Sequence, residues 1–198
     1  MTAMIGARRP TKETDKVSRS STTDIPRVVT ERLILRAHCA SDFEASLTMW
    51  SDADVVRHIG GVPSTAADAW SKLLRYIGLW RFLGYGYWAV EDRTTGRFIG
   101  EVGFADFKRD IGKDLDGMPE AGWVISPSWA GRGYATEAMR AALEWFDHTM
   151  PGTESFCMIA PVNRASTKVA QKLGYAVHQQ ITYKERSVQI HLRSSCRS

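Results

Sequence analysis

The sequence predicts a single α/β domain in which helices are inserted into a β-rich middle region. Three observations support this fold class. The chain has 198 residues, a length typical of one domain. Hydrophobic residues make up 43% of it, as expected for a globular chain with a sizeable core. Short apolar runs of strand length alternate with segments of helical periodicity, which is the pattern of a layered α/β domain.

The chain begins with a segment, residues 1–27, that we expect to be a disordered basic tail ahead of a folded part covering residues 28–198. The first 26 residues are polar and lack periodicity. Residues 1–27 hold six basic and three acidic side chains, so they carry +3 of the net charge of +4. The folded part is therefore nearly neutral, which argues against broad nucleic-acid binding.

The early elements follow from apolar spacing and from cap residues. Residues 28–37 contain Leu33-Ile34-Leu35 and predict a strand. The run 41–44, Ser-Asp-Phe-Glu, has the form of a capping box that starts a helix. A second helix begins near Thr65, with Asp68 three residues later. The expected apolar faces of these two helices are Phe43, Leu47 and Trp50, and Ala69, Leu73, Ile77 and Trp80.

The middle of the chain predicts a hairpin, a loop, a strand and a helix. Strands over 87–91 and 97–105 flank a turn and form the hairpin. A charged loop over 106–119 leads to a strand over 120–126. The amphipathic helix that follows covers about 136–149. Its expected apolar face comprises Met139, Ala142, Leu143 and Phe146.

The last quarter of the chain completes the sheet. A strand covers 155–159, and Asn163 caps a short helix that ends at Gly174. Two closing strands are expected over 175–181 and 187–192.

The most informative motif is the glycine-rich turn between the strand at 120–126 and the helix from Thr136. Gly131 and Gly133 allow a tight turn and close approach of a ligand to the backbone. The helix start offers unpaired N–H groups, and Arg132 adds a positive charge, so the turn is a candidate phosphate site. The plainer alternative is a tight connection without a ligand. The turn matches neither a P-loop nor a dinucleotide-binding fingerprint.

Three further side chains are candidates for chemistry. Asn163 and Ser166 are either a helix cap or hydrogen-bond partners for a ligand arm rich in amides or for a leaving group. Glu120 starts the strand before the glycine turn, where a carboxylate beside an apolar cleft could accept a proton. Glu101 and Glu185 are rival carboxylates, and a solvated strand-end acid is the plainer interpretation of Glu120.

Composition also predicts absences. The five histidines are dispersed and the three cysteines lie far apart, so we expect no metal site and no disulfide framework. Cys157 lies in an apolar strand and is expected in the core. No apolar run is long enough to cross a membrane, and the cysteine usage fits a reducing cytoplasm.

The motifs together, in this order and spacing, resemble the GNAT superfamily of N-acetyltransferases, and within it the Rim-type branch that acts on ribosomal-protein N-termini. The resemblance covers nearly all of residues 28–193. It is carried by the runs 30–36, 86–90, 95–100, 120–125, 130–135 and 163–175. One departure is Ala130, which stands where the family's loop begins with Gln or Arg.

The resemblance implies a mixed, mostly antiparallel sheet splayed into a V, with helices on both faces and acetyl-CoA in the cleft. Backbone N–H groups of Arg132, Gly133, Tyr134, Ala135 and Thr136 would hold the diphosphate. Main-chain groups of Val124 and Ile125 would pair with the pantetheine arm, as an added strand does.

The same resemblance implies roles for three side chains. Asn163 would bond the pantetheine arm, Ser166 would protonate the leaving thiolate, and Glu120 would be the general base. The acetyl group would pass directly to a primary amine of a protein N-terminus or a small molecule, within one ternary complex.

Two other functions stay open at this stage. One is a non-catalytic acyl-CoA-binding module, and the other is an RNA- or ribosome-associated protein that uses its basic tail. The acceptor is not readable from the sequence, although its wall is expected from the two early helices, the loop 106–119 and the region 183–186. The oligomeric state is equally open, a homodimer included.

Overall fold

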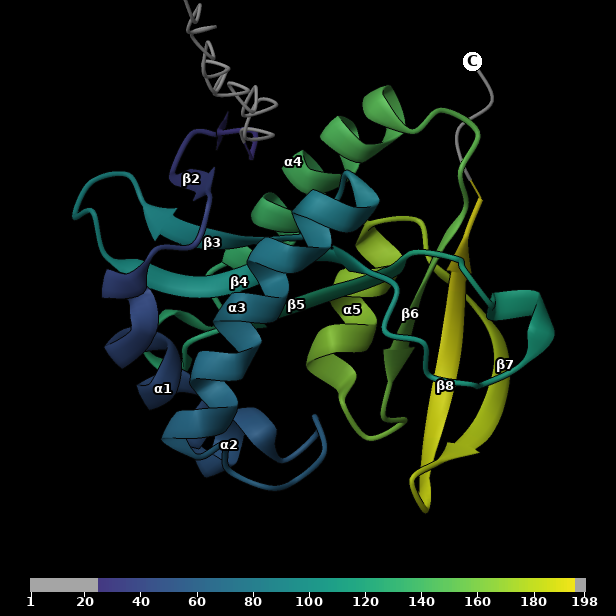
Figure 1. Ribbon diagram of the computed structural model, residues 1–198. Coiled ribbons are helices and arrows are strands. Elements are labelled where there is room, and N and C mark those ends of the chain that lie inside the picture. Colours follow the sequence, from purple (N-terminus) through teal and green to yellow (C-terminus); the bar gives the residue numbers. More distant parts are fainter. Residues whose placement is uncertain (1–24, 195–198) are drawn as a thin grey trace, which may run out of the picture.

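A computed structural model describes residues 25–194 of the chain. Its eight strands form one sheet in the order β1-β2-β3-β4-β5-β6-β8-β7, in which only β5 and β6 pair in parallel (Figure 1). The strands are β1 (Val28–Val29), β2 (Leu33–Arg36), β3 (Tyr87–Asp92), β4 (Phe98–Ala105), β5 (Glu120–Ile125), β6 (Ser155–Ile159), β7 (Ala176–Tyr183) and β8 (Arg186–Arg193). The predicted α/β domain with a mixed, mostly antiparallel sheet is confirmed.

Helices cover both faces of the sheet. They are α1 (Phe43–Ser51), α2 (Ala53–Val56), α3 (Ala66–Leu83), α4 (Tyr134–Thr149) and α5 (Arg164–Lys172). On one face, Tyr76 of α3 stacks on Tyr87 of β3 with ring centroids 4.6 Å apart. On the other, Phe146 of α4 stacks on Phe104 of β4 at 4.2 Å. Figure 1 shows α3 crossing in front of the central strands, while the hairpin of β7 and β8, here called the β7–β8 arm, lies beside β6 at the end of the sheet.

Helices α3, α4 and α5 form where their caps and apolar faces predict them. Thr65 and Asp68 form the expected capping box of α3, and Asn163 caps α5. All four predicted core residues of α4 are buried. The helix begins at Tyr134, two residues earlier than expected, because the left-handed Gly133 is its N-cap.

The first elements differ from expectation because of one buried ion pair. The guanidinium of Arg36 holds both carboxylate oxygens of Asp42, at 2.7 and 2.8 Å, and also Glu91 at 2.6 Å. Asp42 therefore ends a 3-10 helix (Ala40–Asp42) and accepts a bond from the Cys39 amide, so the cap predicted at Ser41 is wrong.

Other local details also differ. The segment predicted as the first strand forms two strands, β1 and β2. The sequence analysis did not predict the short helix α2. The buried face of α3 contains Tyr76 in place of Ile77, which is 45% exposed. The predicted tail lies outside the described residues except for its last three, of which Ile25 packs against the core and Pro26 accepts a hydrogen bond from Trp88 at 2.7 Å.

His38 makes the folded state sensitive to acid. Its ring is buried against Tyr76, and neither of its ring nitrogens has a partner within the described part of the chain. Burial lowers the pKa of His38 to about 4. Between about pH 6.5 and 4 the unfolded chain therefore binds a proton that the folded chain does not, and folding is weakened by about 2–3 kcal/mol.

Urea unfolding at pH 7 and pH 4.5 tests this expectation. The free energy of unfolding should fall with pH in the parent protein, and His38→Leu should remove that part of the fall. An equal fall in both proteins would show that His38 is not responsible.

Candidate active site

The site forms where β5 and β6 separate. Their ladder consists of one register pair, Glu120 with Phe156, so the rest of β5 pairs with no strand of the described chain on that side. On its other side β5 pairs with β4, and just beyond the end of β5 the Ser126 amide donates to the carbonyl of Ile99 in β4 at 2.9 Å. Because main-chain groups alternate along an antiparallel strand, those of Trp123 and Ile125 point into the opening.

This alternation changes the role predicted for the main chain of Val124. Ile125 lies as expected on the open edge of β5, but the main chain of Val124 faces β4 within the sheet. The amide neighbouring Ile125 on the open edge is that of Trp123. Val124 instead contributes its side chain to the cleft.

The glycine turn presents a helix N-terminus without a side-chain cap. Gly131 and Gly133 have φ of 77° and 83°, in the left-handed region that favours glycine. Gly133 is the N-cap of α4 and, having no side chain, makes no capping bond to the first amides of that helix. The N–H groups of residues 134–136 therefore lack helical partners and lie at the positive end of a 16-residue helix.

Arg32 braces this turn, a role that the sequence did not reveal. Its guanidinium donates to Glu137 at 2.6 Å and to the carbonyl of Arg132 at 3.1 Å, and it lies 4.4 Å from the centroid of the Tyr134 ring. Burial disfavours ionisation of Glu137, but hydrogen bonds from Thr30 and Arg32 outweigh it and lower the pKa of that carboxyl. The first turn of α4 is thus held by Thr30 and Arg32, which lie in the turn between β1 and β2.

Two cavities meet along β5. The smaller, of about 250 Å³, is lined by the glycine turn, the start of α4 and one side of α5. The larger, of about 640 Å³, lies among β5, α3, the loop 106–109 and the tip of the β7–β8 arm. Trp123 and Ser166 line both cavities, so the two adjoin at the open edge of β5.

Most of the predicted site residues line this cleft. Ile125, Gly133, Tyr134, Ala135 and Thr136 line the smaller cavity, Glu120, Val124 and Asn163 line the larger, and Ser166 lines both. The side chain of Arg132 is exposed and lines neither, with its guanidinium 5.8 Å from the centroid of the Trp129 ring. The Asn163 side-chain oxygen accepts from the Ser166 amide at 3.1 Å and so fixes both residues.

Glu120 lies at the inner end of the larger cavity and is 7% exposed. Both of its carboxylate oxygens accept bonds from Arg109, at 2.5 and 2.9 Å. Burial raises the pKa of Glu120, and the ion pair with Arg109 opposes the rise. Each oxygen keeps a free lone pair, so the carboxylate can still accept a proton from a neighbouring group.

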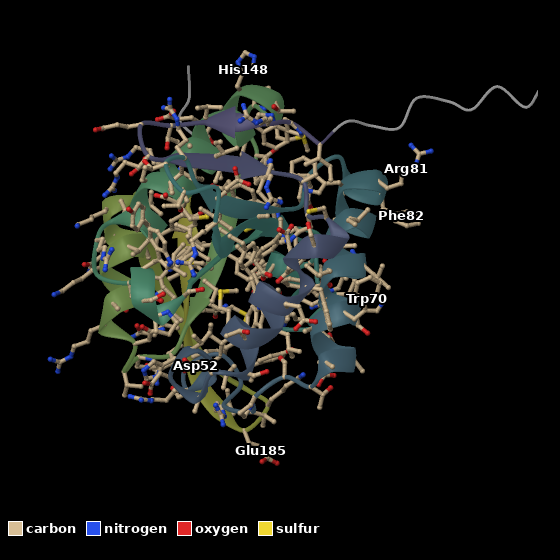
Figure 2. All side chains as sticks on the ribbon, turned by 90° about the vertical axis from the view of Figure 1, so that its left-hand side faces the viewer. Asp52, Trp70, Arg81, Phe82, His148 and Glu185 are labelled. Carbon is tan, nitrogen blue, oxygen red and sulfur yellow. The ribbon has the colours of Figure 1, made fainter. Side chains whose placement is uncertain are left out.

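The two rival carboxylates lie elsewhere. Glu101 is fully buried and bonded by Ser46 at 2.8 Å and Trp50 at 2.9 Å, and burial raises its pKa. It does not line the cleft. Glu185 is exposed in the turn at the tip of the β7–β8 arm, pointing away from the body of the protein (Figure 2). Glu120 is therefore the carboxylate best placed for acid–base chemistry.

Tyr87 is a cleft residue that the motifs did not mark. Its hydroxyl lies directly against Gly122 of β5, where any side chain would displace it. Burial raises the pKa of Tyr87, and the nearby charge of Glu120 adds to the rise. Two weak signals for Tyr87 were present in the sequence. Gly122 has no side chain, and Tyr87 stands among several aromatic residues that suggest either an aromatic lip or core packing, namely Trp80, Phe82, Tyr85 and Tyr87 itself.

A family comparison decides what this cleft is. Residues 32–176 match the family model described as an acetyltransferase (GNAT) domain. The chain belongs to the GNAT acetyltransferase family. It is an acetyl-CoA-dependent N-acetyltransferase, which transfers an acetyl group from acetyl-CoA to a primary amine.

Similar proteins agree with this assignment. The GNAT chain is 27% identical over 147 residues to the uncharacterized N-acetyltransferase YnaD of Bacillus subtilis, covering 74% of this chain and 81% of that protein. A solved GnaT-family acetyltransferase from Bordetella pertussis is 27% identical with a TM-score of 0.77, over 85% and 99% of the two chains. The coenzyme A complex of RimL, a ribosomal L7/L12 α-N-protein acetyltransferase, is 15% identical with a TM-score of 0.69, over 85% and 98%, and shows the shared fold.

Several expected absences concern the described residues alone. Within 25–194 no cluster of three or more His, Cys, Asp or Glu could hold a metal ion. No helix in that range is long and apolar enough to span a membrane. Cys157 is buried in the core and burial raises the pKa of its thiol, so it is a poor nucleophile.

Proposed function

We propose that this acetyltransferase binds acetyl-CoA across the smaller cavity and the open edge of β5, and binds its acceptor amine in the larger cavity. One observation carries the proposal: an uncapped helix N-terminus and the unpaired edge of β5 line the same cavity, which adjoins the larger one. The amides of residues 132–136 would hold the diphosphate. The main chain of Trp123 and Ile125 would pair with the amide-rich arm, as an added strand does.

Two side chains at the start of α5 fit the same ligand. The Asn163 oxygen is occupied by the Ser166 amide, which leaves the Asn163 NH₂ group to donate into the larger cavity. Ser166 lies where the two cavities meet. We propose that its hydroxyl gives a proton to the sulfur when the carbon–sulfur bond breaks and takes up a proton from solvent in return.

Glu120 is the proposed base. Acetyl-CoA supplies an activated acetyl group as a thioester, and the attacking amine must first lose a proton, since amines of this kind have pKa values of about 8 to 10. Glu120 accepts that proton directly or through one water, while Arg109 holds the carboxylate in place. The new carbon–nitrogen bond then forms in one ternary complex, and no covalent enzyme intermediate is needed.

The proposal also covers the branch of the family, the acceptor class and the cellular compartment. The shared fold with RimL, a ribosomal L7/L12 α-N-protein acetyltransferase, supports a place in the Rim-type branch, with protein N-termini among the acceptors. Two free cysteines in the described chain, Cys39 and Cys157, fit a reducing cytoplasm.

A thiol-release assay tests the proposed function. The protein, acetyl-CoA and a panel of primary amines should release free coenzyme A only when both substrates are present. The two hydrogen bonds from Arg109 to Glu120 favour one other function. In this alternative the protein is a non-catalytic binding module, and Glu120 is structural. Tight coenzyme A binding with no thiol release for any amine would support that module and contradict catalysis.

A further inference from the structure

The acceptor cavity carries an excess of positive charge. Its charged lining comprises the cations Lys72, Arg75, Lys108, Arg109 and Lys184 and the carboxylates Asp106 and Glu120. Both carboxylates are already neutralised, Asp106 by Lys108 and Glu120 by Arg109. The three other cations form no ion pair with any carboxylate of the described chain.

These three cations are not equivalent. The ammonium of Lys72 lies 3.6 Å from the centroid of the Trp50 ring, and the buried charge of Glu101 attracts it. Lys72 is thus partly satisfied within the protein. Arg75 and Lys184 are exposed, and within the described chain neither side chain forms a hydrogen bond or an ion pair; each lies near an aromatic ring, so its charge stays available to a ligand.

Aromatic rings connect these two cations to the proposed base. Two guanidinium groups lie near the Phe107 ring, that of Arg109 at 4.7 Å from the ring centroid and that of Arg75 at 5.2 Å. On the other side, Tyr183 accepts a bond from Arg109 at 3.2 Å and has the Lys184 ammonium 5.6 Å from its ring centroid. The Phe107 ring therefore connects Arg75 to the Glu120–Arg109 pair, and the Tyr183 ring connects Lys184 to it.

We propose that the acceptor is a primary amine that also carries an anionic group, a carboxylate or a phosphate, and that the positive charges of Arg75 and Lys184, which lie on either side of the Glu120–Arg109 pair, attract this group. The inference rests on the proposed function, because it takes the larger cavity as the acceptor site. An anionic group at the rim complements the two free cations while the amine points inward to Glu120. The surrounding positive charge also favours the neutral amine, which is the form that attacks.

Matched acceptors test this specificity. Thiol release is measured with O-phosphoethanolamine against ethanolamine, with β-alanine against its methyl ester, and with spermidine. Short peptides that begin Ser-Asp or Ser-Lys form a second arm, which separates a small-molecule source of the anion from an acidic N-terminus. The anionic member of each pair should have a KM lower by about tenfold, as one favourable charge contact predicts.

Charge-reversal variants then test whether Arg75 and Lys184 recognise the anionic group. Arg75→Glu and Lys184→Glu should each raise the KM for the anionic acceptor about tenfold, without raising the KM for acetyl-CoA or for the acceptor that lacks the anionic group. Arg81→Glu is the matched control, because Arg81 lies on the same helix but points outward, away from the cleft (Figure 2). It should behave as the parent protein.

The outcomes separate this inference from the proposed function. Equal or better use of ethanolamine, methyl ester and spermidine, unaffected by Arg75→Glu, would overturn the anionic acceptor while leaving acetyl transfer intact. If no amine is acetylated although coenzyme A binds, the proposed function fails. Calorimetry of O-phosphoethanolamine with the coenzyme A-saturated protein then decides the inference: binding that Arg75→Glu abolishes supports it, and no binding overturns it.

Discussion

Gly133→Val should weaken coenzyme A binding by about 100-fold, which corresponds to the loss of about two backbone bonds to a charged group. The proposed diphosphate site consists of main-chain N–H groups, so a side chain at the N-cap of α4 stands where the ligand must approach. A Cβ at this position would meet only the end of Arg32, at 3.6 Å, so the protein itself has room for it. Isothermal titration calorimetry measures the affinity.

Backbone strain is the competing explanation for such a loss, and Gly152→Val controls for it. Gly152 has a φ of 80°, close to the 83° of Gly133, and a Cβ added there would also find open space. It lies in the turn after α4 and lines neither cavity of the cleft. Both variants should lose similar thermal stability, but only Gly133→Val should lose affinity. Parent-like affinity in a folded Gly133→Val protein would contradict the backbone cradle.

Glu120→Gln should lower kcat about 100-fold or more, within the usual range for loss of a general base, while the affinity for coenzyme A stays unchanged. Glutamine keeps an oxygen for one bond from Arg109 but cannot accept the amine proton. Because burial raises the pKa of Glu120, kcat should begin to fall at a higher pH than an ordinary glutamate would give, as acid protonates the base. The variant should lack this acidic limb.

Glu185→Gln is the matched control for this change, since Glu185 is exposed at the tip of the β7–β8 arm (Figure 2). Its turnover and pH profile should equal those of the parent protein. Steady-state thiol release between pH 5 and 9 measures both variants. An unchanged profile in Glu120→Gln would remove Glu120 from the chemistry and leave it as a structural partner of Arg109.

Local signals predicted most of the fold. Strand β6 and helix α5 follow from short-range patterns, an apolar run and an asparagine cap, and the structure has them at the expected residues. The beginning of the fold was harder, because the bond between Arg36 and Asp42 decides where the first helix starts. A four-residue helix such as α2 is too short to show a period.

In the candidate site, too, some residues could be recognised from local sequence and others only from the fold. The residues of the glycine turn and of α5 were recognisable because each acts through its own local backbone. Arg32 and Tyr87 act on residues distant in sequence, Arg32 on the start of α4 and Tyr87 against β5, so no spacing along the chain reveals them. The alternation of faces along β5 was clear from sequence, but which main-chain groups face the opening depends on the register with β4.

A crystal structure with coenzyme A tests the central claim most directly. The diphosphate should accept hydrogen bonds from amides among residues 132–136, and the pantetheine arm should pair with the main chain of Trp123 and Ile125. Coenzyme A bound elsewhere, or held there by side chains with these amides unbonded, would contradict the account.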